Sequence, residues 1–368
     1  MRIVLTGGGT GGHIFPLISV ARKLKEKLGS EAEILYVGPK GKLEKEVMER
    51  EGIPTRHAMS GKVRRYFSFK NFSDFLKIPV GFIQALWILI AYMPDVVFSK
   101  GGYASFPVVL AAWFYRIPVL VHESDAMPGM ANRILGKISK RVAISYPSTD
   151  KYFLASKTVL TGNPKREKIT QGDISEARKK FNLTESKPVI FVMGGSQGSQ
   201  TVNDAIIKIL PQLLHRSQVI HQTGEEKFED VKRLAAEMGI KEGREGYHAA
   251  PFLQIDDLKD ALAVADLIIS RAGANSIADA AATGKPVILI PLSAAANDHQ
   301  RMNAYELAEI GAALVLEESN LGENILMEKI EKILGDKNLS NNMAEKIKAF
   351  YHPDAADKIA YGLINLVK

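Results

Sequence analysis

Short apolar runs alternate with longer amphipathic stretches along the whole chain. In the first half these runs are three to five residues long, rich in Val, Ile and Leu, and mostly followed by glycine or polar residues. Strand-length apolar runs separated by helix-length stretches are typical of a parallel sheet wrapped by helices. The predicted strands of this half cover residues 3–5, 34–37, 95–99, 118–122, 141–145 and 158–160.

The pattern is interrupted at Gly162-Asn163-Pro164 and then starts again. A strand-like run at residues 188–193 leads into a second glycine turn. We therefore predict an α/β protein with two doubly wound parallel-sheet domains, at residues 1–163 and 164–350. Because ligands of such sheets bind beyond the carboxyl ends of the strands, both glycine turns would open into one cleft. The later predicted strands cover residues 219–222, 247–249, 267–270, 286–291 and 313–316.

The first strand runs into a glycine-rich loop at residues 7–12, which is followed by His13. Pro16 suits the first turn of a helix that we expect to run to about residue 27, and free N–H groups at such a start favour an anion. The loop also matches the G-x-G-x-x-G pattern of dinucleotide sites, which needs an acid after the second strand. That strand ends instead in Gly38-Pro39-Lys40, so a dinucleotide site is kept as an alternative. His13 is predicted to contact ligand, although a histidine here could simply cap or pack the helix.

The amino-acid composition limits the chemistry that the protein can use and the molecules that it can bind. The chain has 368 residues, no cysteine and a formal net charge of +7. The lack of cysteine excludes disulfides, thiolate metal sites and a thiol nucleophile. The positive charge favours phosphates, an anionic membrane surface or nucleic acid. The sequence starts directly with the first strand and shows no signal peptide, so we expect a cytoplasmic protein.

Residues 61–93 form the most unusual segment, because basic and aromatic residues precede the apolar run 80–93. This run is too short to span a bilayer and is expected to be a helix whose inner face packs on the sheet. The residues before it suit a surface that enters the interface of an anionic membrane. Nucleic acid would also suit them, but no nucleic-acid-binding motif is present and we predict no such partner. The predicted membrane-docking residues are Arg64, Arg65, Phe67, Phe69, Phe72, Phe75 and Lys77.

Four further clusters lie where predicted strands end. Residues 99–107 contain another glycine turn, with Gly102 and Tyr103. Residues 122–125 read His-Glu-Ser-Asp, and such a density of titratable groups is costly near a core unless the groups are paired or used. Residues 194–198 read Gly-Gly-Ser-Gln-Gly and have the form of a diphosphate-binding turn. Residues 270–276 begin another helix, with Asp279 one turn inside it.

Together these motifs resemble a known family. GGTGGH, KGGY, HES, GNP-x-R, GGSQGS, RAGANS and NDHQ occur in the order found in bacterial N-acetylglucosaminyltransferases of glycosyltransferase family 28, and the resemblance covers essentially the whole chain. It implies the GT-B fold, in which two Rossmann-like domains face each other and a C-terminal helix, here residues 351–368, returns to the first domain. It also implies the conversion of lipid I to lipid II in peptidoglycan synthesis, and with it a role in cell-wall biogenesis, cell shape and cell division.

By this resemblance the second domain binds UDP-N-acetylglucosamine. The main chain near Ile255 would read uracil, and His299 and Gln300 would meet sugar hydroxyls. The family usually holds the ribose diol with glutamate, and the matching residue here is the shorter Asp279, which can still accept two hydrogen bonds. The implied UDP-N-acetylglucosamine-binding residues are Thr10, Gly11, Gly12, Arg166, Gly195, Ser196, Gln197, Ile255, Asp279, His299 and Gln300.

The same resemblance puts the lipid acceptor on the first domain. Its diphosphate would lie at residues 10–12, which are also candidates for the sugar nucleotide, and at Gly102 and Tyr103. The family usually has asparagine where this chain has Asp125. An acid at this position could hydrogen-bond an acceptor hydroxyl or serve as base.

The implied reaction needs a base and a stabilised leaving group. The C4 hydroxyl of the N-acetylmuramoyl unit must lose a proton while it attacks the anomeric carbon with inversion. His13 is the first candidate base, because imidazole titrates near neutral pH, and Asp125 or Glu123 is the second. Arg166 and the helix after Gly198 would stabilise the departing UDP. We expect no cofactor and no required metal, since no Asp-x-Asp stretch ends a strand.

The implied partners are UDP-N-acetylglucosamine, undecaprenyl-linked lipid I, the cytoplasmic leaflet of an anionic membrane and a cell-wall synthesis or division complex. Other classes stay open. One is another GT-B enzyme of UDP-sugars, either a glycolipid glycosyltransferase or a UDP-N-acetylglucosamine epimerase, and an epimerase would have no use for the exposed aromatic segment. The other is a non-catalytic, membrane-docked nucleotide-binding protein, which would lack polar groups on the first domain. This chain has four such groups there, namely His13, Tyr103, His122 and Glu123.

Overall fold

A computed structural model describes residues 1–9, 11–61, 69–164, 167–195, 197–241, 243–244, 246–293 and 298–367. The chain divides into two compact units. The first unit consists of Met1–Lys165 together with His352–Lys368, and the second unit of Arg166–Tyr351.

The first unit is built on a parallel sheet of seven strands in the order β3-β2-β1-β4-β5-β6-β7. The chain moves from β1 to one side of the sheet and then crosses to β4 on the other, so the loops after β1 and β4 flank a topological switch point. The strands are β1 (Arg2–Thr6), β2 (Glu33–Gly38), β3 (Thr55–His57), β4 (Val96–Ser99), β5 (Val119–Glu123), β6 (Arg141–Ile144) and β7 (Thr158–Leu160).

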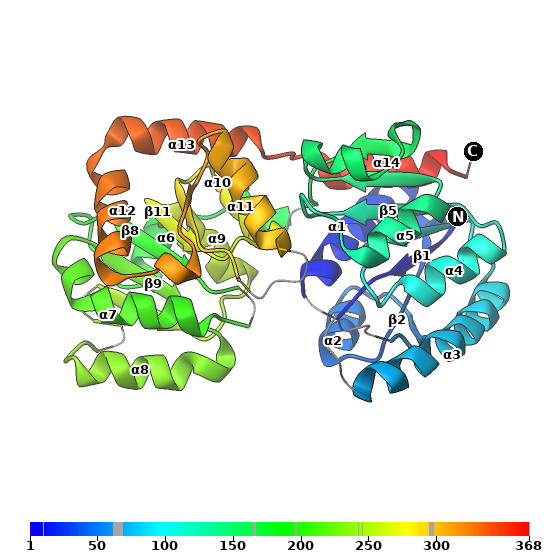
Figure 1. Ribbon diagram of the computed structural model, residues 1–368, viewed down its shortest axis with the longest axis horizontal. Coiled ribbons are helices and arrows are strands. Elements are labelled where there is room, and N and C mark those ends of the chain that lie inside the picture. Colours follow the sequence, from blue (N-terminus) through cyan, green and yellow to red (C-terminus); the bar gives the residue numbers. More distant parts are fainter. Residues whose placement is uncertain are drawn as a thin grey trace. The chain divides into compact units, whose positions relative to one another are not determined.

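Helices cover both faces of this sheet (Figure 1). Because side chains alternate along a strand, Ile3 and Leu5 pack against α1 and α14, whereas Val4 packs on the opposite face with α3, α4 and α5. The C-terminal helix α14 therefore completes the core of the first unit, beside α1. The helices are α1 (Gly11–Leu28), α2 (Lys42–Arg50), α3 (Phe69–Tyr92), α4 (Phe106–Phe114), α5 (Met130–Ile138) and α14 (Ala355–Asn365).

Two details of the first unit differ from the sequence-based expectation. Helix α1 begins at Gly11, so Pro16 lies in its second turn and His13 is inside the first turn. A proline there removes the hydrogen bond that an N–H at this position would donate to the carbonyl four residues earlier, because Pro16 lies beyond the first-turn N–H groups that lack helical partners. The edge strand β3 was not predicted, because its residues Thr55-Arg56-His57 are polar and largely exposed.

The second unit repeats the architecture with six parallel strands in the order β10-β9-β8-β11-β12-β13, and its switch point lies between β8 and β11. The prediction of two doubly wound parallel sheets is confirmed. The strands are β8 (Val189–Met193), β9 (Gln218–Gln222), β10 (Tyr247–Ala250), β11 (Leu267–Ser270), β12 (Val287–Leu289) and β13 (Leu314–Val315). The helices are α6 (Ile174–Lys180), α7 (Gln200–Arg216), α8 (Phe228–Glu237), α9 (Ile255–Val264), α10 (Ala274–Thr283), α11 (His299–Glu309), α12 (Glu323–Gly335) and α13 (Lys337–Ala349).

Candidate active site

The glycine loop after β1 already holds a carboxylate of the protein itself. Gly9 has a φ of 90°, a conformation that favours glycine, and its N–H donates to Glu44 Oε1 at 2.8 Å. The hydroxyl of Tyr36 donates to the Gly7 carbonyl from the other side. Glu44 belongs to α2, and its side chain is only 6% exposed. The sequence analysis did not find it, because an acid was expected directly at the end of the second strand and Glu44 lies several residues further on. The loop is thus shaped to present a main-chain N–H to an anion.

His13 lies against the second glycine turn of the first unit. A Cβ on Gly102 would come within 3.3 Å of the imidazole Nε2, and the ring also hydrogen-bonds the backbone of Gly8. Loss of water around the ring and then the charge of Lys100 lower the pKa of His13 to about 4, although the Asp125 carboxylate opposes the change. The imidazole is therefore unprotonated at physiological pH, as a base must be. Its pKa of about 4 nevertheless corrects the expectation that this ring titrates near neutral pH, because burial disfavours the charged form.

The loops after β1 and β4 meet at the switch point. A Cβ on Gly9 would lie 2.8 Å from the Tyr103 hydroxyl, so this ring lies directly against the first loop. Gly102 has a φ of 77°, and its N–H donates to Asn132 Oδ1 at 3.2 Å. The predicted residues His13, Gly102 and Tyr103 are thus brought together. Asn132 was missed, because its position on α5 gives no sequence signal of a contact 30 residues away.

Glu123 holds the loop that follows β5. Its Oε1 accepts from the Asp125 N–H at 3.0 Å, and its Oε2 accepts from the Gly129 N–H at 3.2 Å and from Asn132 Nδ2 at 2.8 Å. Burial, and then the charge of Asp125, raise the pKa of Glu123 to about 7. A carboxylate with three protein donors is suited to fixing Asp125 and Asn132 in place, and its role as a base remains a prediction.

His122 is fully buried and faces its own unit. Its Nε2 lies 3.0 Å from the Gly162 carbonyl and 3.3 Å from Ser145 Oγ. Burial holds the pKa of His122 well below its usual value. The ring therefore joins the end of β5 to the segment that leaves the first unit.

The glycine turn after β8 occupies the equivalent place in the second unit. Gly198 has a φ of 69°, and a Cβ there would lie 1.9 Å from the Thr223 carbonyl oxygen, so a side chain cannot be accommodated. The Gly195 carbonyl accepts from Gln222 Nε2 at 3.2 Å. Ser199 caps α7, with its Oγ accepting from the Val202 N–H at 3.2 Å. Contacts at Gly195 and Ser199 thus anchor the two ends of this segment, which leads directly into a helix N-terminus.

A buried ion pair joins this turn to two neighbouring loops. The Arg271 guanidinium, directly after β11, lies 2.6 Å from Ser199 Oγ and 2.5 Å from Glu318 Oε1, and it also donates to the Ile290 carbonyl at 3.2 Å. Glu318 in turn accepts from the Ser293 N–H at 2.9 Å. Burial opposes ionisation of Glu318, but hydrogen bonds from Ser293 and Arg271 outweigh it and lower the pKa to about 2. Sequence reasoning did not assign a role to either partner.

The other predicted donor-binding residues follow β10, β11 and β12 of the second unit. Ile255 is the first residue of α9, Asp279 lies in α10 with 6% of its surface exposed, and His299 begins α11. The Oε1 of Gln300 accepts from the Leu292 N–H at 3.0 Å. These residues share the carboxyl edge of one sheet, and their contacts with a ligand remain predictions.

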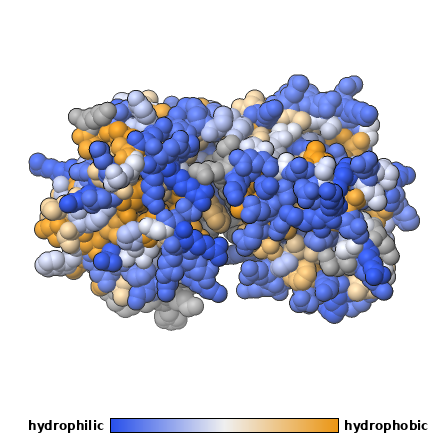
Figure 2. Space-filling model, turned by 180° about the vertical axis from the view of Figure 1, so that it is seen from behind, coloured by the Kyte–Doolittle hydropathy of each residue, from blue (hydrophilic) through white to orange (hydrophobic). Residues whose placement is uncertain are grey.

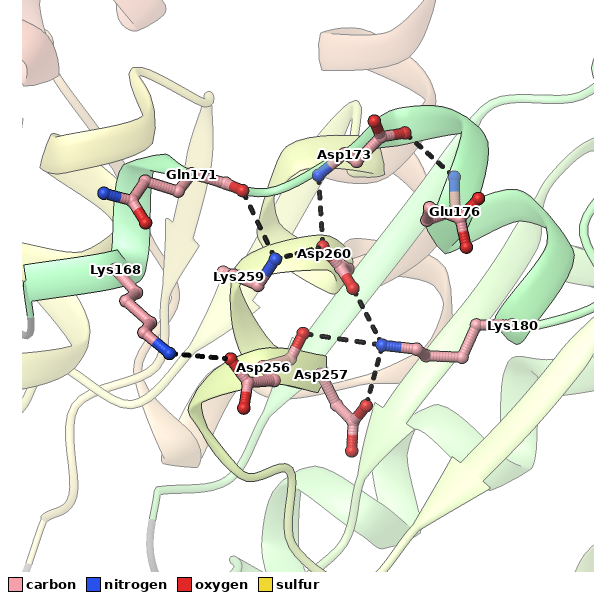
Figure 3. A network of polar contacts seen from close by, with 9 residues as sticks. All are labelled: Lys168, Gln171, Asp173, Glu176, Lys180, Asp256, Asp257, Lys259 and Asp260. Atoms are coloured by element: carbon pink, nitrogen blue, oxygen red, sulfur yellow. Dashed lines mark hydrogen bonds and ion pairs between the residues drawn. The ribbon is translucent and has the colours of Figure 1, made fainter.

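The start of α9 is anchored by a charged network (Figure 3). Lys180 Nζ lies 2.8 Å from Asp260 Oδ2 and 2.9 Å from Asp257 Oδ1. The other oxygen of Asp260 accepts from the Asp173 N–H at 3.1 Å. Asp257 is in the first turn of α9 and Asp260 in the second, so the network fixes the helix whose first residue is Ile255.

Several predicted residues lie outside the described part of the chain, namely Thr10, Arg64, Arg65, Phe67, Arg166 and Ser196. Phe69, Phe72 and Phe75 belong to α3, where Lys77 is exposed and lies 2.6 Å from Asp74. Across the described ranges, His, Asp and Glu side chains form no group of three that could hold a metal ion.

The outer faces of α3 and α4 carry exposed apolar side chains. Trp87 is 72% exposed, and it lies on one stripe of α3, whereas Ala85 and Leu89 on the inner face are buried, as predicted. Figure 2 shows apolar residues gathered on the surface of the first unit. Within the described residues, no helix combines the length and apolar character needed to cross a membrane. The exposed residues of this surface are Val80, Ile83, Trp87, Ile90, Met93, Trp113 and Phe114.

Residues 3–144 match the N-terminal domain of glycosyltransferase family 28, and residues 189–359 match the C-terminal domain of the same family. The chain belongs to glycosyltransferase family 28. The resemblance seen in the motifs is therefore confirmed, and the two glycine turns described above are family 28 loops.

Relatives and solved structures agree with this family. One relative is the UDP-N-acetylglucosamine--N-acetylmuramyl-(pentapeptide) pyrophosphoryl-undecaprenol N-acetylglucosamine transferase of Lachnospira eligens. The two sequences are 39% identical over 368 residues, and the alignment covers 100% of this chain and 98% of the relative. The crystal structure of MurG from Acinetobacter baumannii aligns with a TM-score of 0.77 at 28% identity, over 99% of both chains. A UDP-GlcNAc 2-epimerase from Neisseria meningitidis aligns with a TM-score of 0.70 at 13% identity, over 99% of this chain and 100% of that one, and so shares the fold.

Proposed function

We propose that this chain is an inverting glycosyltransferase of peptidoglycan synthesis. It transfers N-acetylglucosamine from UDP-N-acetylglucosamine to the C4 hydroxyl of the N-acetylmuramoyl unit of lipid I, which yields lipid II. The observation that carries the proposal is similarity along the full chain to a relative named as a transferase of this kind. Glycine turns at both switch points support it, because each leads into a helix start of the kind that binds phosphate.

The second unit is the proposed site of the UDP donor. Its glycine turn is braced by Arg271 and Gln222, so the main chain is held before a ligand arrives. Pre-organised N–H groups stabilise the charge that develops on a departing diphosphate without a cost of reorganisation. We propose that this turn and Arg166 bind the diphosphate and that no metal is required.

The first unit is the proposed site of the acceptor. The C4 oxygen of the acceptor forms a bond to the anomeric carbon, the bond from that carbon to the phosphate oxygen breaks, and UDP leaves with the electron pair. His13 receives the hydroxyl proton, because its imidazole is neutral and lies at the meeting point of two glycine turns. Asp125 is the second candidate for this role.

The apolar surface of α3 and α4 is the proposed contact with the cytoplasmic leaflet. Trp87 and Trp113 are 72% and 52% exposed, and such large side chains in one patch mark a site of interaction. A lipid-linked acceptor stays in the membrane, so the first unit must come to it. The predicted basic and aromatic residues before α3 belong to the same proposed surface.

Incubation of the purified chain with radiolabelled UDP-N-acetylglucosamine and a lipid I analogue tests the proposal. We expect labelled lipid product with a β-1,4 linkage. Conversion of UDP-N-acetylglucosamine without acceptor into its 2-epimer would instead support the epimerase alternative. A folded chain that binds UDP but forms neither product would contradict both enzymatic functions.

A further inference from the structure

The peptide group between Gly8 and Gly9 is held at both of its ends. Its N–H belongs to Gly9 and donates to Glu44 Oε1 at 2.8 Å. Its carbonyl belongs to Gly8 and accepts from the imidazole of His13, a bond that favours a protonated ring nitrogen. A trans peptide is planar and directs its N–H and its carbonyl to opposite sides. Glu44 and His13 therefore bond the same rigid unit from its two sides.

This peptide group depends on outside contacts, because glycines flank it. Gly8 has a φ of 147° and Gly9 a φ of 90°, conformations that favour glycine, and without side chains the plane between them can rotate easily. A Cβ on Gly8 would lie 3.0 Å from Glu44 Oε1 and 2.8 Å from the Tyr36 hydroxyl, so both side chains lie directly against the loop. Tyr36 donates to the Gly7 carbonyl at 2.5 Å and so holds the preceding peptide group.

Glu44 and Tyr36 are fixed parts of the first unit. Tyr36 is fully buried on β2, and Glu44 is 6% exposed in the first turn of α2. A Cβ on Gly38 would clash with the Tyr36 hydroxyl, and a Cβ on Gly41 would clash with Glu44 Oε2. Glycine at these two positions therefore leaves room for the side chains that reach the loop from the next strand and helix.

We propose that Glu44 is a positioning residue for His13 and acts through the peptide group between Gly8 and Gly9. The inference rests on the proposed function, because it concerns the proposed base. The ring nitrogen that donates to Gly8 carries a hydrogen, so the other nitrogen of the neutral imidazole is left to receive the proton of the lipid acceptor. The bond to Glu44 polarises the same peptide and strengthens its carbonyl as a hydrogen-bond acceptor. This role requires an oxygen at position 44 that accepts from Gly9, and no charge.

Three variants test the oxygen at position 44. Glu44→Ala removes it, Glu44→Gln keeps it, and Glu46→Ala is the matched control on the exposed side of α2. We expect Glu44→Ala to lower kcat for transfer to a lipid I analogue by about tenfold or more, because a small displacement of a catalytic group is costly. Its KM for UDP-N-acetylglucosamine should stay within about twofold of the wild type, since the second unit is unchanged. Glu44→Gln and Glu46→Ala should transfer within about threefold of the wild type.

The imidazole of His13 gives a readout that a merely structural role would not move. Proteins labelled with nitrogen-15 histidine are compared by NMR at neutral pH, and the signals of His13 are those that His13→Gln lacks. The wild type and Glu44→Gln should show one neutral tautomer. Glu44→Ala should show a mixture of the two, because the Gly8 carbonyl no longer fixes the ring.

Tyr36→Phe keeps the test decisive if Glu44→Ala does not fold. It removes only the hydroxyl that holds the Gly7 carbonyl, and it should cause the same change of tautomer with a smaller loss of kcat. A single tautomer in every folded variant would overturn the positioning role, and so would transfer by Glu44→Ala at the wild-type rate. Faster transfer by Glu44→Ala would also overturn it, since Glu44 would then compete with a ligand for the Gly9 N–H.

Failure of this proposal and failure of the proposed function can be told apart, because the tautomer of His13 is measured without substrate. If the wild type transfers no sugar but Glu44→Ala changes the tautomer, the proposed function is wrong and the connection between Glu44 and His13 stands. If the wild type transfers sugar and the tautomer is unchanged, only the connection is wrong.

Discussion

The two units share a fold, yet the carboxyl edges of their sheets are built differently. In the second unit the buried Arg271 is paired directly with Glu318 at 2.5 Å, and the pair braces the glycine turn. In the first unit Lys100 is buried, the pKa of His13 is lowered, and that of Glu123 is raised. Perturbed titratable groups cluster at functional sites, but a structural ion pair such as that of Arg271 and Glu318 also shifts a pKa, so the contrast lies in how the charges are paired. The difference supports the proposal that the second unit binds the donor and the first unit carries out the proton transfer.

The largest expected effect of a single change on stability is in the second unit. Arg271→Met removes the partner of the Glu318 carboxylate, whose side chain is only 14% exposed. Loss of one partner of a buried pair costs about 3–5 kcal/mol, because the remaining charge is left uncompensated. We expect the free energy of unfolding in urea to fall by about this amount and the affinity for UDP to fall with it.

Arg216→Met is the matched control for this change. Arg216 pairs with Glu331 at 3.0 Å, but its side chain is 80% exposed. Exposed pairs contribute little, so the midpoint of unfolding should hardly move. Equal losses in the two variants would contradict the view that the buried pair braces the turn.

A smaller effect, dependent on pH, is expected from Glu123. Its pKa rises from 4.5 to about 7 on folding. Because the pKa of Glu123 is higher in the folded state, its contribution to the free energy of unfolding is complete below pH 4.5, the pKa of the unfolded chain. This contribution is lost as the pH rises through about 7, the pKa of the folded chain. Between pH 5 and pH 8 the wild type should therefore lose up to about 3 kcal/mol more unfolding free energy than Glu123→Gln.

Urea unfolding at the two pH values measures this difference. Glu46→Gln, an exposed change on α2 of the same unit, provides the comparison and should follow the wild type. A loss in Glu123→Gln as large as in the wild type would show that the Glu123 carboxyl is ionised normally in the folded chain.

The smallest expected effect on stability comes from the exposed apolar residues of α3, whose replacement should instead weaken binding to membranes. Ile83 and Trp87 are 55% and 72% exposed, so replacing both with serine should leave the unfolding midpoint nearly unchanged. Transfer of one large apolar side chain out of water provides about 1.5–3 kcal/mol, so binding to vesicles with anionic lipid should weaken about tenfold or more. Met238→Ser on the second unit should bind vesicles like the wild type, and equal binding by all three proteins would remove α3 from the proposed membrane contact.

The sequence predicts the central strands well because their apolar runs are buried on both faces, and it also predicts β7, whose residues are largely exposed. The run that became β4, for example, is wholly buried, and its four residues were all predicted. The edge strand β3 could not be found in this way, because Thr55-Arg56-His57 has no core side to mark it. The start of α1 was also misjudged, since Pro16 is compatible with more than one position near a helix start.

The candidate site was predicted only in part, because the sequence shows which residues end the strands but not which distant residues contact them. Strand ends are visible in the sequence, so His13, Gly102 and Tyr103 could be expected near one another. Their supporting contacts are not visible, because they depend on distant elements. Glu44 reaches the glycine loop from 35 residues away, and Asn132 reaches Gly102 from 30.

The central claim is that the first unit carries out the proton transfer and the second unit binds UDP. The most direct test measures both the transfer activity of His13→Ala and its affinity for UDP. Transfer to the lipid I analogue should fall by about 100-fold or more, because general-base catalysis is typically worth 10²–10⁴. The Kd for UDP should stay within about twofold of the wild type, since only the acceptor edge is altered. Transfer within a few-fold of the wild type, or a loss of UDP affinity that matches the loss of transfer, would contradict the assignment of proton transfer to the first unit.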